Sequence, residues 1–130
     1  MRFHHIGIAC EDIPSALEFA ERSFPVINKT EIIFDKKQAV NLCLLTLADG
    51  TYIELVSGST VSRLVEKKQF LYHTCWEVDN LDRAIAKFYE NGAMLISTPK
   101  KAVLFNDRKV AFLFTDLGIM ELLESVDHVV

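Results

Sequence analysis

The chain has 130 residues, half of them apolar, and a net charge of −4 at pH 7. This length allows one domain with a hydrophobic core and is too short for two independent ones, so we expect a single domain over residues 1–130. Acidic and basic residues are interspersed without a basic stripe, which argues against nucleic acid as the main partner.

The sequence contains no apolar segment approaching the roughly 20 residues that cross a bilayer. Its most apolar run, residues 39–48, is interrupted by polar residues. The N-terminus enters a strand-like pattern at once, without an apolar signal segment, so we expect a cytoplasmic protein. Three cysteines lack the spacing of a redox or metal motif and are expected to be reduced core residues: Cys10, Cys43 and Cys75.

The first half of the chain predicts one strand, one helix and three further strands. Residues 3–9 form an apolar run. Glu11-Asp12-Ile13-Pro14 is typical of a helix start, because an acidic residue caps free amides and proline fits the first turn. Apolar residues then recur at helical spacing until Pro25. A turn at Asp49-Gly50 joins the last two of three predicted strands, at residues 30–34, 39–47 and 51–56.

The second half repeats this order of elements. Residues 71–78 predict a strand, and Asp79-Asn80 predicts the cap of a helix whose apolar stripe runs from Leu81 to Phe88. Gly92 ends this helix. Three strands follow, at residues 93–97, 108–115 and 118–123.

The two halves can be aligned by position. His5 lies 68 positions before His73, and Glu54 lies 67 positions before Glu121. Both glutamates stand inside apolar strands, where a carboxylate is rare unless something pairs with it. The sequence therefore predicts two βαβββ modules, at about residues 3–58 and 71–125, related by an approximate two-fold axis.

Each module brings one histidine on its first strand and one glutamate on its last. Two carboxylates placed close together repel unless a cation lies between them, and a divalent metal resolves that conflict. Imidazole and carboxylate ligands without thiolate suit Ni, Co, Mn, Fe or Zn. Taken singly, each residue is more often an ordinary surface or core group. As a repeated pair of pairs, they predict a metal site: His5, Glu54, His73 and Glu121.

Three nearby polar residues are not assigned to this site. His4 lies on the opposite strand face from His5, and Glu124 points the other way from Glu121. His128 belongs to the C-terminal tail and is expected to be exposed.

Several stretches that span nearly the whole chain resemble a known family: His4-His5-Ile6-Gly7-Ile8-Ala9, Tyr52-Ile53-Glu54-Leu55, Tyr72-His73-Thr74-Cys75-Trp76-Glu77-Val78-Asp79, Arg108-Lys109-Val110-Ala111-Phe112-Leu113 and Met120-Glu121-Leu122-Leu123-Glu124. They resemble the vicinal oxygen chelate superfamily, which includes glyoxalase I, methylmalonyl-CoA epimerase, extradiol dioxygenases and bleomycin-resistance proteins. The resemblance implies an α+β fold, in which paired βαβββ modules form an open eight-stranded cleft. It also implies one divalent metal ion on the four residues named above.

Within the superfamily, two histidines with two glutamates look like glyoxalase I. That likeness implies a lyase or isomerase that converts the hemithioacetal of an α-ketoaldehyde and a thiol to a hydroxyacyl thioester, through a metal-bound ene-diolate. Glu121 or Glu54 would take the proton from carbon and return it to the neighbouring carbon. The family commonly forms homodimers.

Methylmalonyl-CoA epimerase is the nearest alternative, because it uses the same ene-diolate chemistry. Its pattern carries Gln where Glu54 stands and a proton-shuttling glutamate where Lys37 stands. A lysine of ordinary pKa is protonated at neutral pH and cannot act as that base. The sequence therefore favours a glyoxalase I-like enzyme first and an epimerase-like enzyme second.

A third alternative is a protein that binds a small molecule without turning it over, as bleomycin-resistance proteins do. Such members usually lack the full ligand set, so the four potential ligands favour an enzyme. Extradiol dioxygenases use two histidines and one carboxylate on iron, and the fourth ligand argues against them. Five basic residues are candidates to receive an anionic group of the substrate: Lys36, Lys37, Lys100, Lys101 and Arg108.

Overall fold

The protein's structure is a computed structural model that describes residues 1–126. Within this range the chain forms nine strands and three α-helices, and it divides into two compact units. The N-terminal unit comprises residues 5–72, and the C-terminal unit comprises residues 1–4 and 73–126. None of the helices in the described part of the chain is long and apolar enough to span a membrane. His128, expected to be exposed, lies outside the described residues.

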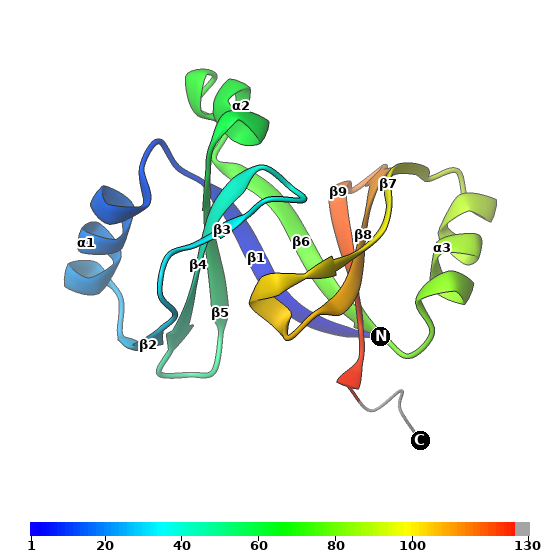
Figure 1. The fold of residues 1–130 in the computed structure, drawn as a ribbon, viewed down its shortest axis with the longest axis horizontal. Coiled ribbons are helices and arrows are strands. Elements are labelled where there is room, and N and C mark those ends of the chain that lie inside the picture. Colours follow the sequence, from blue (N-terminus) through cyan, green and yellow to red (C-terminus); the bar gives the residue numbers. More distant parts are fainter. Residues whose placement is uncertain (127–130) are drawn as a thin grey trace. The chain divides into compact units, whose positions relative to one another are not determined.

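The N-terminal unit is a sheet with one helix packed against it (Figure 1). Its strands are ordered β2-β4-β5-β1, and β3 also pairs with β4. The β1–β5 pair is parallel and the other pairs are antiparallel. The elements are β1 (Arg2–Ala9), which begins in the C-terminal unit, α1 (Ile13–Ser23), β2 (Val26–Lys29), β3 (Ile33–Asp35), β4 (Val40–Leu47), β5 (Tyr52–Ser57), a 3-10 turn (Ser59–Val61) and α2 (Ser62–Glu66).

The core of this unit lies between α1 and one face of the sheet. Asp12 starts the helix as predicted, because its side chain accepts a hydrogen bond of 3.0 Å from the free amide of Ser15. Leu45 of β4 and Leu55 of β5 pack against the buried side of the helix, which includes Ile13. Burying one such side chain contributes about 1.5–3 kcal/mol.

The C-terminal unit repeats this architecture. Its strands are ordered β6-β9-β8-β7, with β6–β9 parallel and the other pairs antiparallel. The two units thus share one strand order, which confirms the predicted pair of βαβββ modules in an α+β fold. The elements are β6 (Leu71–Val78), α3 (Leu81–Glu90), β7 (Met94–Ala102), a 3-10 turn (Val103–Phe105), β8 (Arg108–Thr115) and β9 (Gly118–Glu124).

The second core lies between α3 and the sheet of this unit, and Figure 1 shows α3 alongside β7, β8 and β9. Asn80 caps the helix as predicted, accepting a hydrogen bond of 2.9 Å from the amide of Arg83. Leu81, Leu113 and Leu122 are buried there, with Phe88 of the helix packed against them.

The strand predicted at residues 30–34 is wrong in its bounds. The chain instead forms two short strands, because β2 ends at Lys29 and β3 begins at Ile33. Between them, the backbone N–H of Leu44 donates a hydrogen bond of 3.0 Å to the hydroxyl oxygen of Thr30. In a regular strand pair a backbone carbonyl of the neighbouring strand would accept this bond. This side-chain bond interrupts the ladder with β4.

Two further elements differ from the prediction. β7 continues past residue 97 to Ala102, although Pro99 lies within it. Proline is tolerated because β7 ends the strand order of its unit, and its pairing with β8 is irregular on both sides of Ser97. The short helix α2 was not predicted, since five residues give too little periodicity.

The turn between β3 and β4 is held against the start of the 3-10 turn. Ala39 in that turn has φ +56°, a conformation that L-residues rarely adopt. Gly58 has φ +126°, and a Cβ placed there would lie 3.1 Å from the carbonyl oxygen of Ala39. The hydroxyl of Thr60 donates to the carbonyl of Gln38 at 2.9 Å. These contacts fix the shape of the turn.

Ala39→Gly is expected to raise the free energy of unfolding by about 0.5–1 kcal/mol, because glycine relieves the left-handed strain that alanine carries. Ala48→Gly is the matched control, since Ala48 is an exposed turn residue without a positive φ. It is expected to lower stability, because glycine makes the unfolded chain more flexible. Urea unfolding measures the free energy of unfolding of both variants. Equal destabilisation by the two substitutions would show that Ala39 is not strained.

Candidate functional site

The N-terminal unit buries one imidazole beside one carboxylate. Ile53 and Leu55 of β5 pack toward α1, so strand alternation turns Glu54 to the opposite face. β1 runs parallel to β5 with Gly7 beside Glu54, and His5 shares that face two residues earlier. His5 Nε2 lies 3.6 Å from Glu54 Oε1, and the two residues are 0% and 3% exposed.

The C-terminal unit contains the equivalent pair. Leu122 of β9 packs toward α3, so Glu121 points to the other face of the sheet. β6 runs parallel to β9 with Cys75 beside Glu121, and His73 shares that face two residues earlier. His73 Nε2 lies 3.2 Å from Glu121 Oε1, and each of the two residues is 2% exposed.

The donor atoms of both pairs fit a divalent metal ion. In each unit an imidazole Nε2 faces a carboxylate Oε1. Two neighbouring ligands bound at about 2.1 Å and at right angles to each other are about 3 Å apart. The observed separations of 3.2 and 3.6 Å are close to that distance. One histidine and one glutamate of each unit are therefore suited to be adjacent ligands.

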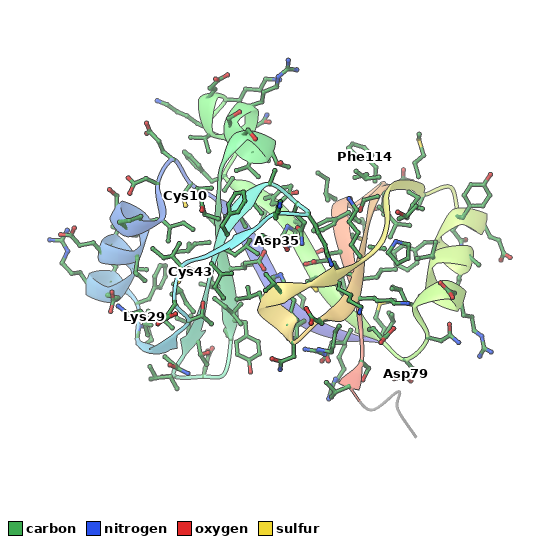
Figure 2. The ribbon with its side chains drawn as sticks, in the orientation of Figure 1. Cys10, Lys29, Asp35, Cys43, Asp79 and Phe114 are labelled. Carbon is green, nitrogen blue, oxygen red and sulfur yellow. The ribbon has the colours of Figure 1, made fainter. Side chains whose placement is uncertain are left out.

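No disulfide joins the three cysteines, of which Cys43 and Cys75 are buried and Cys10 is half-buried. Burial, with a smaller contribution from the nearby Asp12 carboxylate, raises the pKa of the Cys10 thiol to about 11. Burial likewise raises the pKa of Cys43, which lies against α1 in Figure 2. Both side chains are neutral thiols at physiological pH.

The other polar residues near these pairs have different neighbours. His4 belongs to the C-terminal unit, whereas His5 belongs to the N-terminal unit. The ring of His4 meets Phe105 edge to face, with centroids 5.2 Å apart. Glu124 is half-buried, and its backbone carbonyl accepts a hydrogen bond of 3.2 Å from Arg108.

The structure separates the five basic candidates by exposure and by contacts. Lys36, Lys37 and Lys101 are exposed, and Lys100 is half-buried. Arg108 is held by other groups of the C-terminal unit, since its Nη1 donates to Glu77 Oε2 at 2.9 Å and to the carbonyl of Glu124. An arginine held in this way has less capacity to receive a substrate anion.

Glu77 lies between two guanidinium groups, an arrangement that sequence reasoning missed. Its Oε1 accepts from Arg2 at 2.9 Å and its Oε2 accepts from Arg108 at 2.9 Å. Burial is the largest single influence on the pKa of Glu77 and raises it, whereas the hydrogen bonds from Arg108 and Arg2 and the nearby charges of His4 and Arg2 all lower it and are larger in sum. The pKa of Glu77 is therefore lowered from its ordinary value of 4.5.

Glu77→Gln is expected to destabilise the protein at pH 7, because it removes the charge between Arg2 and Arg108. A carboxyl whose pKa falls on folding stabilises the native state fully above its ordinary pKa of 4.5. That stabilisation is lost as the pH falls through the lower pKa of the folded state. Urea unfolding should therefore show a smaller difference between wild type and variant at pH 3 than at pH 7. An equal difference in stability at pH 3 and pH 7 would contradict the ion pairs of Glu77 with Arg2 and Arg108.

The turn between β3 and β4 contains the position at which the epimerase pattern carries its shuttle glutamate. The buried carboxylate of this turn belongs to Asp35 and not to that position. Lys37 is exposed there. Asp35, which is labelled in Figure 2 and is 3% exposed, accepts from the amides of Lys37 and Gln38 at 2.9 and 3.2 Å, and from Gln38 Nε2 at 3.0 Å. An aspartate that ends a strand before a turn is the signal that could have identified this role. The Asp35 carboxylate holds the turn, and the turn presents a lysine to solvent.

Comparison with known proteins identifies one matching family. A family profile described as the glyoxalase/bleomycin resistance protein/dioxygenase superfamily matches residues 4–112. No curated protein sequence matches the chain significantly.

Several solved structures share the fold. A hypothetical protein from Bacillus halodurans C-125 is 23% identical with a TM-score of 0.75, covering 95% of this chain and 94% of that one. Methylmalonyl-CoA epimerase from Mycobacterium tuberculosis is 18% identical with a TM-score of 0.81, covering 96% and 88%. A variant of the Streptomyces coelicolor epimerase in complex with 2-nitronate-propionyl-CoA is 21% identical with a TM-score of 0.73, covering 97% and 98%. Such low identities establish a common fold and leave the activity to the site itself.

Proposed function

Because the chain belongs to the glyoxalase/bleomycin resistance protein/dioxygenase superfamily, we propose that it is a divalent-metal-dependent enzyme that moves a proton on the carbon next to a thioester carbonyl. The proposed reaction class is that of a methylmalonyl-CoA epimerase, and the proposed substrate is a small acyl thioester. The observation that carries this proposal is the buried pair of imidazole Nε2 and carboxylate Oε1 that recurs in both units.

The proposed metal site combines the pairs of the two units. It has four ligands: His5, Glu54, His73 and Glu121. The repeat supports this combination, because equivalent strands of each unit contribute the same two ligand types. A bound Ni, Co, Mn or Zn ion supplies positive charge that stabilises negative charge developing on the oxygen atoms of a substrate.

The chain's own part in the reaction is proton transfer. Glu121 and Glu54 are the two carboxylates of the proposed site, and a carboxylate oxygen can take the proton from carbon and return it. Both carboxylates are buried. Burial limits the access of bulk water to the protonated carboxyl, which slows side reactions at this site.

The choice between the two enzyme classes follows from the similar structures, and one turn decides which residues are assigned the proton transfer. Sequence resemblance placed a glyoxalase I-like enzyme first. Solved epimerases of the same fold, one of them with an acyl-CoA analogue, support the epimerase class instead. The position of the shuttle glutamate in the epimerase pattern is taken here by Lys37, which is exposed. The carboxylate of the neighbouring Asp35 is hydrogen-bonded within its own turn. Proton transfer is therefore assigned to the glutamates of the site.

A glyoxalase I-like activity is the second candidate. Glu54 supports this candidate. Together with Glu121 and the two histidines it gives the set of two histidines and two glutamates that resembles glyoxalase I. The two candidates share the removal of a proton from carbon next to a carbonyl. They differ in the substrate, which is an acyl thioester in one case and a thiol hemithioacetal in the other.

Glu121→Gln is expected to slow hydrogen exchange at the methyl-bearing carbon of methylmalonyl-CoA by about 100-fold or more, because it removes a carboxylate that acts in proton transfer. Proton NMR in D₂O follows the exchange with protein loaded with Co, Ni, Mn or Zn. Glu124→Gln is the matched control, since it makes the same change on the other face of the same strand. This control is expected to retain the wild-type rate.

The same preparations are then given the hemithioacetal of methylglyoxal and a thiol. Thioester formation without exchange on methylmalonyl-CoA would replace the epimerase with the glyoxalase candidate. Wild-type protein that binds metal and turns over neither substrate would favour a small-molecule-binding protein over an enzyme.

A further inference from the structure

One aromatic ring contacts the histidine of the C-terminal pair. The ring of Phe112 in β8 meets the His73 imidazole edge to face, with centroids 5.2 Å apart and planes at 85°. Phe112 also lies directly opposite Glu121 in the antiparallel pairing of β8 with β9. Residues directly opposite on neighbouring strands share a sheet face. Phe112 therefore adjoins both members of the pair, and it is 8% exposed.

The N-terminal unit has no ring at the equivalent register position. Leu44 of β4 lies directly opposite Glu54, as Phe112 lies opposite Glu121. The imidazole and carboxylate are 3.6 Å apart in the unit with leucine and 3.2 Å apart in the unit with phenylalanine. The repeat thus provides an internal comparison, in which the closer pair has the aromatic neighbour.

We propose that Phe112 is a positioning residue that fixes the orientation of the His73 imidazole toward Glu121 and thereby strengthens metal binding by this pair. This inference rests on the proposed metal function. The torsion that turns an imidazole about its bond to Cβ has broad minima, so a ring without a close planar neighbour samples many orientations. An edge-to-face aromatic contact narrows that range. Hydrogen-bonding groups that orient metal-ligating histidines commonly change metal affinity by about 10–100-fold when they are removed. An apolar ring contact is expected to have a smaller effect of the same sign.

The packing of Phe112 differs from that of the helix-facing core. Ala111 and Leu113, its neighbours in β8, belong to the cluster under α3 together with Leu122. Phe112 points to the other face of the strand, which carries His73 and Glu121. A leucine at this position keeps an apolar side chain on that face and leaves the helix-facing cluster unchanged. The leucine variant is therefore expected to lose the aromatic ring and keep the fold.

Phe112→Leu tests the proposal, and Phe114→Leu is its matched control. Phe114, labelled in Figure 2, lies two residues further along β8 on the same face, opposite Ile119, and is 57% exposed. Competition with a chromogenic chelator measures the Kd for Co²⁺ and Zn²⁺. Phe112→Leu is expected to weaken binding by about threefold to tenfold, and Phe114→Leu is expected to leave the Kd within about twofold of wild type.

A second readout needs no metal. In the metal-free protein, the ring protons of His73 should lie in the ring current of Phe112, and their NMR signals should move in Phe112→Leu and stay in place in Phe114→Leu. If Phe112→Leu does not fold, Phe112→Met replaces it in both experiments. The expected results are the same: weaker metal binding and shifted His73 signals. A folded variant that binds metal like wild type would overturn the positioning role alone. Wild type that binds no metal would overturn the proposed function as well, even if the His73 signals move as expected.

Discussion

Each unit depends on an imidazole and a carboxylate that are buried side by side on the sheet face turned away from the helix. Moving an ionised carboxylate out of water costs several kcal/mol unless a partner compensates it. His5 lies beside Glu54, and His73 lies beside Glu121, at separations of 3.6 and 3.2 Å. Strand alternation makes this arrangement possible, since the neighbouring residues in the same strands fill the core under α1 or α3. Each such strand thus contributes to the helix-facing core on one face and carries a buried polar side chain on the other.

The parts of the structure that the sequence predicted correctly are those with a local signal. Asp12 and Asn80 cap helices as expected, because a capping side chain acts within three residues of its own position. The positions of Glu54 and Glu121 inside apolar strands were also visible, because a single carboxylate in such a strand stands out at both positions of the repeat, and the structure buries both residues. The two-module organisation followed from the same repeat.

The features that the sequence did not predict depend on partners far apart in the chain. Thr30 interrupts a strand through a bond to Leu44, and Glu77 is held by Arg108, 31 residues away. The role of Phe112 is also not readable from sequence, because a phenylalanine in an apolar strand looks like any core residue. Its significance comes from the register of β8 with β9, which places it opposite Glu121.

The two units repeat the buried pair of imidazole and carboxylate and differ in what surrounds it. The N-terminal unit has Leu44 opposite its glutamate and a turn fixed by Asp35, whereas the C-terminal unit has Phe112 opposite its glutamate. Both candidate reactions begin when a carboxylate takes a proton from the carbon next to a carbonyl. An epimerase returns a proton to the opposite face of that carbon, whereas a glyoxalase I-like enzyme returns it to the neighbouring carbon.

The central claim is that the two pairs bind a single divalent ion. Plasma mass spectrometry on protein purified without a histidine tag gives the metal content of wild type, His5→Ala and His73→Ala, after incubation with Ni, Co, Mn and Zn. We expect about one ion per chain in wild type and its loss from both variants, because each unit supplies part of one ligand set. Wild type that stays metal-free, or a variant of one unit that keeps its ion, would contradict the shared site.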